Sequence, residues 1–210
     1  MQLYLSTDDF KVKGFSYPGV PILVTKDHNI FREALDFVVY YCIERGRVKS
    51  TNSWETYGRD LYDYFSFMEA NDLDWRIVKT RTGSMLLAVY RDTSMNQFGL
   101  SANTVNRRLR IAIQFYQYAV ERGWVEVLPY KMENVIVRRS KGFLSHTESR
   151  GSIQASPHVL TKSFKSRIKV LSYTQIRLLL DSIKNRKIKL MVRLMLSTGL
   201  RIWGSGDIPA

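Results

Sequence analysis

Apolar residues recur at helical spacing along much of the first 130 residues. The repeat over residues 27–45 predicts a helix that includes Cys42 in its apolar face, and Gly46 is placed to end it. A second helix is predicted to start at Asn52, a good N-cap, and to close at Asn71-Asp72. Its apolar stripe is expected to face the core, and consists of Trp54, Tyr57, Leu61, Phe65 and Met68.

A longer helix follows a weaker one predicted over residues 84–92. It is expected to start at Ser101 or Asn103, to run to Arg122 and to end at Gly123. One face is apolar and is predicted to lie in the core: Val105, Leu109, Ala112, Tyr116 and Ala119. The opposite face is polar and carries Asn103, Arg107, Arg110, Gln114 and Gln117, with Arg108 between the two faces. Four helices in about a hundred residues predict a compact bundle.

The regions on either side of this bundle have a different composition. Residues 1–26 mix short apolar runs with Gly and Pro, which predicts an N-terminal extension of short strands or loops. Residues 131–169 are rich in Ser, Thr, Gly and basic residues, which predicts a linker. Residues 170–210 begin with a Ser172–Gln175 capping box, and two more helices are expected up to Thr198-Gly199, separated at Asn185. The predicted organisation is therefore 1–26, 27–130, 131–169 and 170–210.

Charge separates the two halves of the chain. The formal net charge is +13, yet residues 1–100 hold 12 basic and 13 acidic side chains, whereas residues 101–210 hold 20 basic and 6 acidic ones. Clustered Lys and Arg favour a polyanionic partner, because phosphate contacts release counterions. Nucleic acid is the leading candidate. The alternative is a basic solvated surface without a specific partner.

Several other classes of protein find no support in the sequence. No apolar stretch reaches 18 residues, and the N-terminus lacks the pattern of a secretion signal, so we expect a cytoplasmic protein without a membrane partner. The single Cys42 cannot form an internal disulfide and is expected to lie in the core. His28, His146 and His158 lack metal-ligand spacing, and no phosphate-binding glycine loop occurs. We therefore expect no metal, cofactor or nucleotide.

Three local patterns resemble one family. They are Thr104-Val-Asn-Arg-Arg-Leu109 with the aromatic residues after it, the apolar helix that carries Trp54, and Leu171-Ser-Tyr-Thr-Gln175 followed by Thr198-Gly-Leu-Arg201. Together they resemble the tyrosine recombinase or phage integrase family over about residues 27–202. The extended N-terminal region is similar to the branch that includes site-specific transposases.

The resemblance implies a mainly α fold: a helical SAM-like core-binding bundle, a basic linker and an incomplete integrase-type catalytic domain. In this family a tyrosine attacks a DNA phosphate, and arginines stabilise the charge that develops. The resemblance makes Arg201 the first of these catalytic arginines; the alternative is a surface arginine at a helix end. The natural parent would then cut and rejoin duplex DNA without a metal or nucleotide.

The sequence departs from the family after Arg201. The family has an acidic residue three positions further on, but Gly204 stands there, and the lysine hairpin, the His-x-x-Arg box and the nucleophilic tyrosine do not follow. We expect a catalytically incompetent chain shortened by a frameshift, an early stop or removal of a piece. A second hypothesis is a non-enzymatic regulator that occupies recombination sites or interferes with full-length recombinase protomers. A third, supported by charge alone, is an RNA-binding module.

Duplex DNA is the expected partner, with full-length recombinase protomers as a second one. The candidate contacts are short polar and long basic side chains, which together suit phosphate recognition. The alternatives are an ordinary solvated helix face and a merely soluble linker. The candidates are Asn103, Thr104, Asn106, Arg107, Arg108, Arg110 and Gln114 on the long helix, and Arg138, Arg139, Lys141, Lys162, Lys165, Arg167 and Lys169 in the linker.

Overall fold

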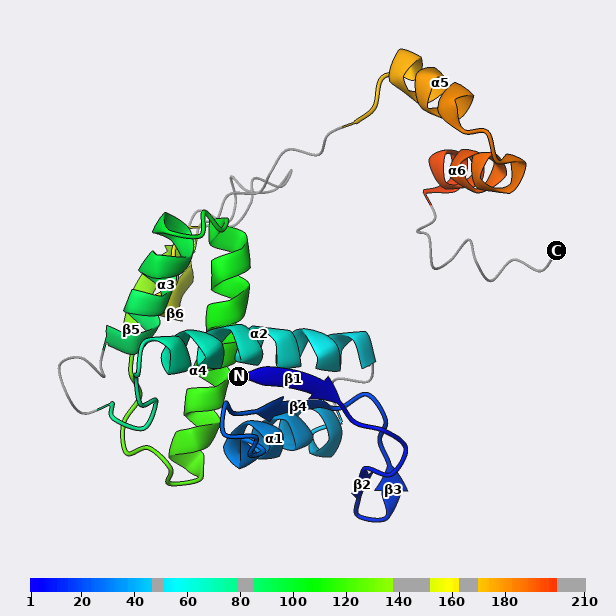
Figure 1. Cartoon of the computed structure of the whole chain (residues 1–210). Coiled ribbons are helices and arrows are strands. Elements are labelled where there is room, and N and C mark those ends of the chain that lie inside the picture. Colours follow the sequence, from blue (N-terminus) through cyan, green and yellow to red (C-terminus); the bar gives the residue numbers. More distant parts are fainter. Residues whose placement is uncertain (47–50, 79–84, 138–151, 163–169, 200–210) are drawn as a thin grey trace. The chain divides into compact units, whose positions relative to one another are not determined.

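Helices dominate the described part of the chain, so the expectation of a mainly α fold is confirmed. A computed structural model describes residues 1–46, 51–78, 85–137, 152–162 and 170–199 (Figure 1). The chain divides into two units, Met1–Phe164 and Lys165–Ala210. The helices of the first unit are α1 (Arg32–Val38), the π-helical segment η1 (Val39–Glu44), α2 (Thr51–Ala70), α3 (Leu86–Asn96) and α4 (Ala102–Glu121).

Helix α4 has the two faces that its periodicity predicts. All five residues predicted to face the core, Val105, Leu109, Ala112, Tyr116 and Ala119, are fully buried. Between them, the ring of Phe115 contacts those of Phe65 on α2 at 4.9 Å and Trp75 at 5.1 Å between centroids. The Phe115 ring also meets that of Phe37 on α1 at 5.6 Å. Aromatic pairs at these distances join α4 to the rest of the bundle.

Helix α2 begins and packs somewhat differently from the sequence expectation. It starts at Thr51, so Asn52 lies within the first turn and accepts a hydrogen bond through its backbone oxygen from the Thr56 hydroxyl at 2.9 Å. The predicted inward stripe is buried except for Tyr57, which is only half-buried. The helix ends as predicted, at Asn71-Asp72.

The helix predicted over residues 27–45 starts later than expected, and its second half has the wider winding of a π-helix. Residue Ile30 still pairs with strand β4 through a bridge to Val24, so α1 begins only at Arg32. From Val39 the winding is that of a π-helix, a form frequent at functional sites. Cys42 is buried as predicted, and burial raises the pKa of its thiol to about 12.

The first residues form a small sheet against α2. Strands β1 (Gln2–Leu5) and β4 (Pro21–Val24) pair antiparallel with Leu3 opposite Leu23, and β2 (Lys11–Val12) pairs with β3 (Phe15–Ser16) in a hairpin. The sheet approaches α2 closely at Gly58, because a Cβ there would lie 2.2 Å from the Cβ of Pro21.

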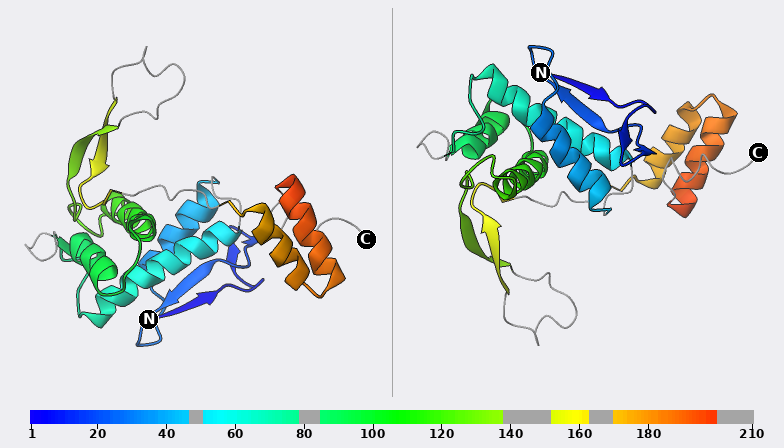
Figure 2. Two further views of the ribbon diagram at one scale, coloured as in Figure 1. Left: turned by 90° about the horizontal axis from the view of Figure 1, so that it is seen from above. Right: turned by 90° about the horizontal axis from the view of Figure 1, so that it is seen from below.

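A second hairpin occupies part of the expected linker 131–169. Strands β5 (Met132–Val137) and β6 (Ser152–Pro157) pair antiparallel, from Met132 opposite Pro157 to Val137 opposite Ser152. The hairpin extends outward from the helices beside α4 (Figure 2). After β6 the chain returns to the bundle, where Val159 is fully buried. The segment therefore differs from a plain linker, since it pairs with itself and packs on the first unit.

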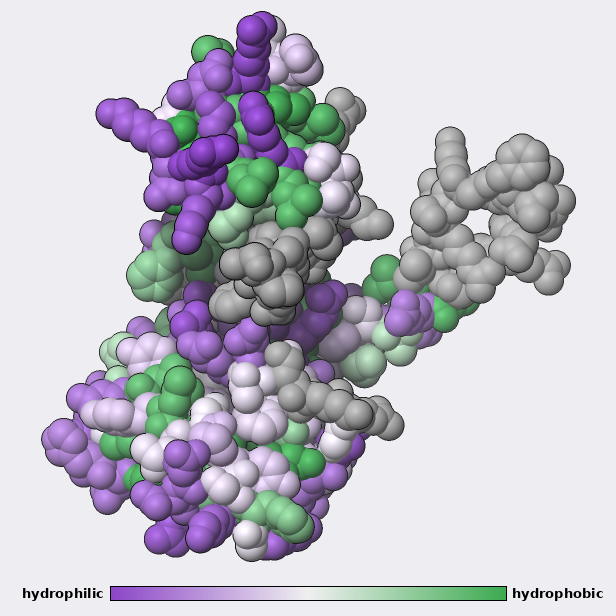
Figure 3. All heavy atoms as spheres, turned by 90° about the vertical axis from the view of Figure 1, so that its right-hand side faces the viewer, coloured by the Kyte–Doolittle hydropathy of each residue, from purple (hydrophilic) through white to green (hydrophobic). Residues whose placement is uncertain are grey.

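The second unit contains α5 (Tyr173–Ser182) and α6 (Arg186–Thr198). The predicted capping box is present: the Ser172 hydroxyl accepts from the Gln175 N–H at 3.3 Å, and the Gln175 side chain accepts from the Ser172 N–H at 2.8 Å. Asn185 separates the helices as the N-cap of α6. No side chain of either helix is buried, and apolar and polar groups lie beside one another on their surface (Figure 3).

The close approach at Gly58 predicts a penalty for any larger residue there. Alanine would ordinarily stabilise a helix relative to glycine, but in Gly58→Ala the new methyl group overlaps the ring of Pro21. We expect a net loss of about 1–3 kcal/mol in the free energy of unfolding. Urea titration followed by circular dichroism measures it. An increase in stability, or a Gly58→Ala penalty that persists unchanged in a Pro21→Gly background, would contradict the predicted steric overlap with Pro21.

Candidate nucleic-acid interface

The polar face of α4 forms one stripe along the first unit. Asn103, Arg107, Arg110 and Gln117 are exposed and Gln114 is half-buried, so the predicted outward face does point outward. The intervals between these residues alternate between four and three, which keeps them on one side of a helix. At 1.5 Å per residue the stripe extends for about 21 Å. We call these five residues the α4 stripe.

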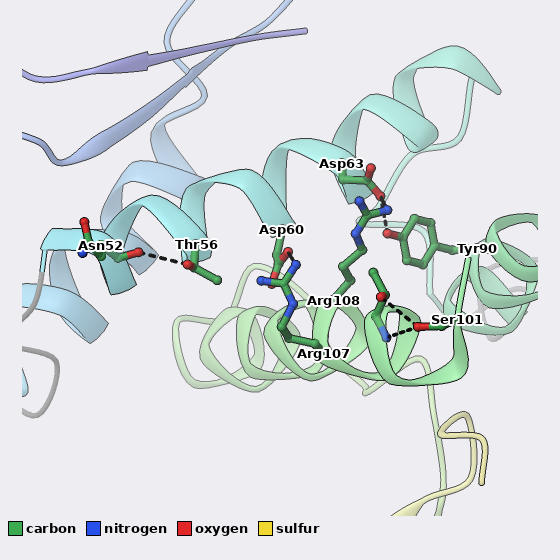
Figure 4. A network of polar contacts seen from close by, with 9 residues as sticks. Asn52, Thr56, Asp60, Asp63, Tyr90, Ser101, Arg107 and Arg108 are labelled. Carbon is green, nitrogen blue, oxygen red and sulfur yellow. Dashed lines mark hydrogen bonds and ion pairs between the residues drawn. The ribbon is translucent and has the colours of Figure 1, made fainter. Parts of the chain in front are cut away.

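Arg107 is anchored at the edge of the stripe by an acidic group on α2. Its Nη2 lies 2.9 Å from Oδ1 of Asp60, whose side chain is only 2% exposed, while the Arg107 side chain is 51% exposed (Figure 4). The other carboxylate oxygen of Asp60 is buried and has no hydrogen-bond partner in the described part of the chain. Burial raises the pKa of Asp60 to about 6, although Arg107 and Arg108 act to lower it.

Arg108 has a different environment from Arg107. Its Nη1 donates to Oδ2 of Asp63 on α2 at 2.8 Å, and the Tyr90 hydroxyl on α3 donates to the same oxygen (Figure 4). The side chain is 21% exposed, and its Nε is buried without a hydrogen-bond partner from any described residue. Arg108 therefore joins three helices inside the unit, and the DNA contact expected of it stays a prediction.

Asn106 also points inward. It is 3% exposed, and its Nδ2 donates to the backbone oxygen of Thr161 at 2.7 Å. Its Oδ1 accepts from the backbone N–H of Thr161 at 3.0 Å and from its hydroxyl at 3.3 Å. Asn106 thus holds the chain after β6 against α4, and Lys162, which is exposed, follows immediately.

Thr104 belongs to the start of α4. Its backbone N–H donates to the Ser101 side chain at 3.3 Å, and the two hydroxyls are 3.0 Å apart. Ser101 is therefore the N-cap, which decides between the two starts that the sequence allows.

Arg110 lies where α4 meets the hairpin. A hollow of about 410 Å³ there is lined by Arg110, Gln114 and Gln117 from α4 and by Gln154 and Ser156 from β6, among others. The sequence analysis did not select these two β6 residues. The run Asn134-Val-Ile-Val137 was the available strand signal, but the Ser- and Gly-rich surroundings favoured a linker.

The structure brings together the α4 stripe, the hairpin and Lys162. The other predicted site residues lie outside the described part of the chain: Arg138, Arg139, Lys141, Lys165, Arg167, Lys169 and Arg201. Among the described residues, no group of three or more His, Cys, Asp or Glu side chains could hold a metal ion.

This helical unit is of a known class. Residues 36–123, from within α1 to the glycine after α4, match the family model of the phage integrase N-terminal SAM-like domain. The match confirms the resemblance to the phage integrases over these residues, which are less than half of the chain. No curated protein and no solved structure matches the chain. In the described residues, no helix is long and apolar enough to span a membrane.

The raised pKa of Asp60 predicts a pH-dependent cost to stability. An unfolded Asp titrates near 3.8, so between about pH 4 and pH 6 the folded protein binds more protons than the unfolded chain does. Asp60 therefore makes its full contribution to the free energy of unfolding below about pH 4, and this contribution is lost as the pH rises to about 6. Asp60→Asn should remove this dependence, gaining up to about 3 kcal/mol over the wild type at neutral pH. Urea titrations of both proteins at several pH values measure the difference. A difference that does not change with pH would contradict the assignment.

The Asn106–Thr161 contact predicts a local effect of mutation. Asn106→Ala leaves the Thr161 backbone groups without their partner, so we expect a loss of about 1–3 kcal/mol and faster amide exchange at Thr161. Asn134→Ala, at an exposed position on β5, is the matched control and should leave that exchange rate unchanged. Equal exchange at Thr161 in wild type and Asn106→Ala would refute the role of this side chain.

Proposed function

We propose that the first unit is the DNA-binding domain of a site-specific tyrosine recombinase, and that it binds duplex DNA through the α4 stripe. The family match supports the class of protein. The observation that carries the interface is the stripe itself, a row of Asn, Arg and Gln side chains that are exposed except for the half-buried Gln114, on a helix whose other face is buried in the core. Such side chains contact phosphates and base edges.

The charges near the stripe support phosphate binding. The ion pair with Asp60 restrains the Arg107 guanidinium, but half of that side chain remains exposed and has further N–H donors. Arg110 forms no ion pair with any other described residue, so its charge is available to a ligand. Lys162 adds a third cation beside α4, because Asn106 holds the preceding residue there.

Arg108 contributes indirectly in this proposal. It fixes α4 to α2 and α3 through Asp63, so it positions the stripe and does not itself contact DNA. The basic residues of the 138–169 region would add phosphate contacts, as the sequence predicts. The role of Arg201 as a catalytic arginine stays a prediction from the sequence.

The proposal predicts that removing the two outward arginines weakens DNA binding. In Arg107→Gln/Arg110→Gln each lost phosphate contact should lower the dependence of log affinity on log salt by about 0.9, so we expect a slope smaller by about 2. Affinity for duplex DNA should fall at low salt for any sequence. Fluorescence anisotropy with a labelled duplex at several salt concentrations measures both quantities.

A matched control removes the same charge elsewhere. Lys11→Gln/Lys13→Gln changes two exposed residues of the β2–β3 hairpin, which lies away from α4 (Figure 1). This variant should keep nearly the wild-type salt slope. If both double variants lose the same affinity and slope, the binding is a general effect of net charge and the α4 stripe is not the interface.

A further inference from the structure

A second hollow lies on the other side of Gln114 and Gln117, between η1, α2 and α4. Its volume is about 510 Å³, within the range of about 300–1,000 Å³ that holds small organic ligands. Three tyrosines line it: Tyr40 and Tyr41 from η1 and Tyr57 from α2. The π-helical winding of η1 carries both of the adjacent tyrosines that line the same hollow.

The tyrosines supply aromatic surface. The rings of Tyr41 and Tyr57 are 6.4 Å apart and inclined by 34°, and the Tyr40 ring is stacked on Tyr118 from α4 at 4.8 Å, so it is held in place. All three side chains are half-buried, which leaves part of each ring open to a ligand. Burial raises the pKa of Tyr41 and of Tyr57, so both hydroxyls stay neutral at physiological pH.

The α4 wall of the hollow is rich in hydrogen-bond acceptors. The side-chain oxygen of Gln114 is buried and has no hydrogen-bond partner among the described residues. Gln117 is oriented by the bond from its Nε2 to the Tyr130 hydroxyl at 3.0 Å, and Glu121 follows one turn later. Because an unpaired buried acceptor is costly, a ligand in the hollow that draws the Gln114 oxygen toward it and donates an N–H is favoured.

Arg45 adds a positive charge to the hollow, which favours a ligand that carries a negative group. Its guanidinium lies over the Tyr41 ring, 4.7 Å from the centroid, and lines the same hollow. This charge attracts a phosphate attached to a planar ring, while the Glu121 carboxylate on the α4 wall can accept a hydrogen bond from an amino group. Aromatic faces, acceptors for amino groups and one arginine are the combination that binds an unstacked nucleobase with its phosphate.

We propose that this hollow binds one unpaired base of DNA, preferentially one with an exocyclic amino group. The inference rests on the proposed function, because Gln114 and Gln117 belong both to the α4 stripe and to the hollow. Adenine, cytosine and guanine can donate to Gln114 through an amino group, whereas thymine has only its ring N3–H, which lies between two carbonyl oxygens that the acceptors of the α4 wall would disfavour. A paired base would first have to leave the stack, at a cost that an extrahelical base does not incur.

The test compares a matched duplex with duplexes that carry one bulged base. The first unit should bind a duplex with a bulged adenine about tenfold more tightly than the matched duplex. A bulged thymine should increase the affinity less. Replacing the bulged adenine with 2-aminopurine, a fluorescent isomer that keeps an amino group, reports stacking directly. We expect its fluorescence to fall on binding.

Two variants separate the hollow from the rest of the interface. Gln114→Met keeps the size of the side chain but removes the acceptor, so the preference for a bulged adenine over a bulged thymine should disappear. Gln2→Met, at an exposed position on β1, is the control and should behave as wild type.

Each outcome decides one of the two proposals. Equal affinity for matched and bulged duplexes, with unchanged 2-aminopurine fluorescence, overturns the proposal that the hollow binds a base but does not contradict duplex binding by the α4 stripe. If no duplex binds, the proposed function fails, and a single-stranded trinucleotide with central 2-aminopurine then tests the hollow separately. Quenching that Gln114→Met abolishes supports base binding there, and absence of quenching overturns it.

Discussion

The packing of Phe115 against aromatic residues of other elements holds the first unit together. Its ring contacts Phe37 from α1, Phe65 from α2 and Trp75, and the neighbouring Tyr116 shares a buried hydrogen bond between hydroxyls with Tyr64 at 2.9 Å. Because these contacts fix the rotation of α4 about its axis, they also fix which residues face solvent. The position of the α4 stripe is therefore a consequence of the aromatic core behind it.

The acidic side chains of α2 give the neighbouring residues Arg107 and Arg108 different environments. Asp60 and Asp63 on α2 each pair with one arginine of α4, but Arg107 remains half exposed whereas Arg108 is largely covered and shares its acid with Tyr90. A buried pair positions an element more than it stabilises it, because the charges must first be desolvated. The raised pKa of Asp60 is the sign of that cost. The three arginines, which are close together in sequence, therefore differ in role. Arg108 fixes α4 to its neighbours, Arg107 is exposed but restrained by Asp60, and Arg110 forms no ion pair with a described residue.

Local sequence patterns were sufficient to predict the two faces of α4, the helices of the bundle and the capping box at Ser172, because each depends on residues within a few turns. It could not predict the inward role of Asn106, whose partner Thr161 is 55 residues away. Nor could it distinguish Tyr57 from the buried members of its stripe, since that depends on η1 and α4 leaving a hollow beside it. The β5–β6 hairpin was missed because composition outweighed a short β-branched run.

Site-specific photocrosslinking to duplex DNA tests the central claim most directly, because it reports which surface lies against the nucleic acid. A photoreactive amino acid would replace Gln117 in the α4 stripe or, in a second protein, the exposed Tyr4 on β1. The account predicts crosslinks from position 117, and few or none from position 4. Crosslinks from position 4 with none from position 117 would show that DNA binds another face, and would contradict the assignment of α4 as the interface.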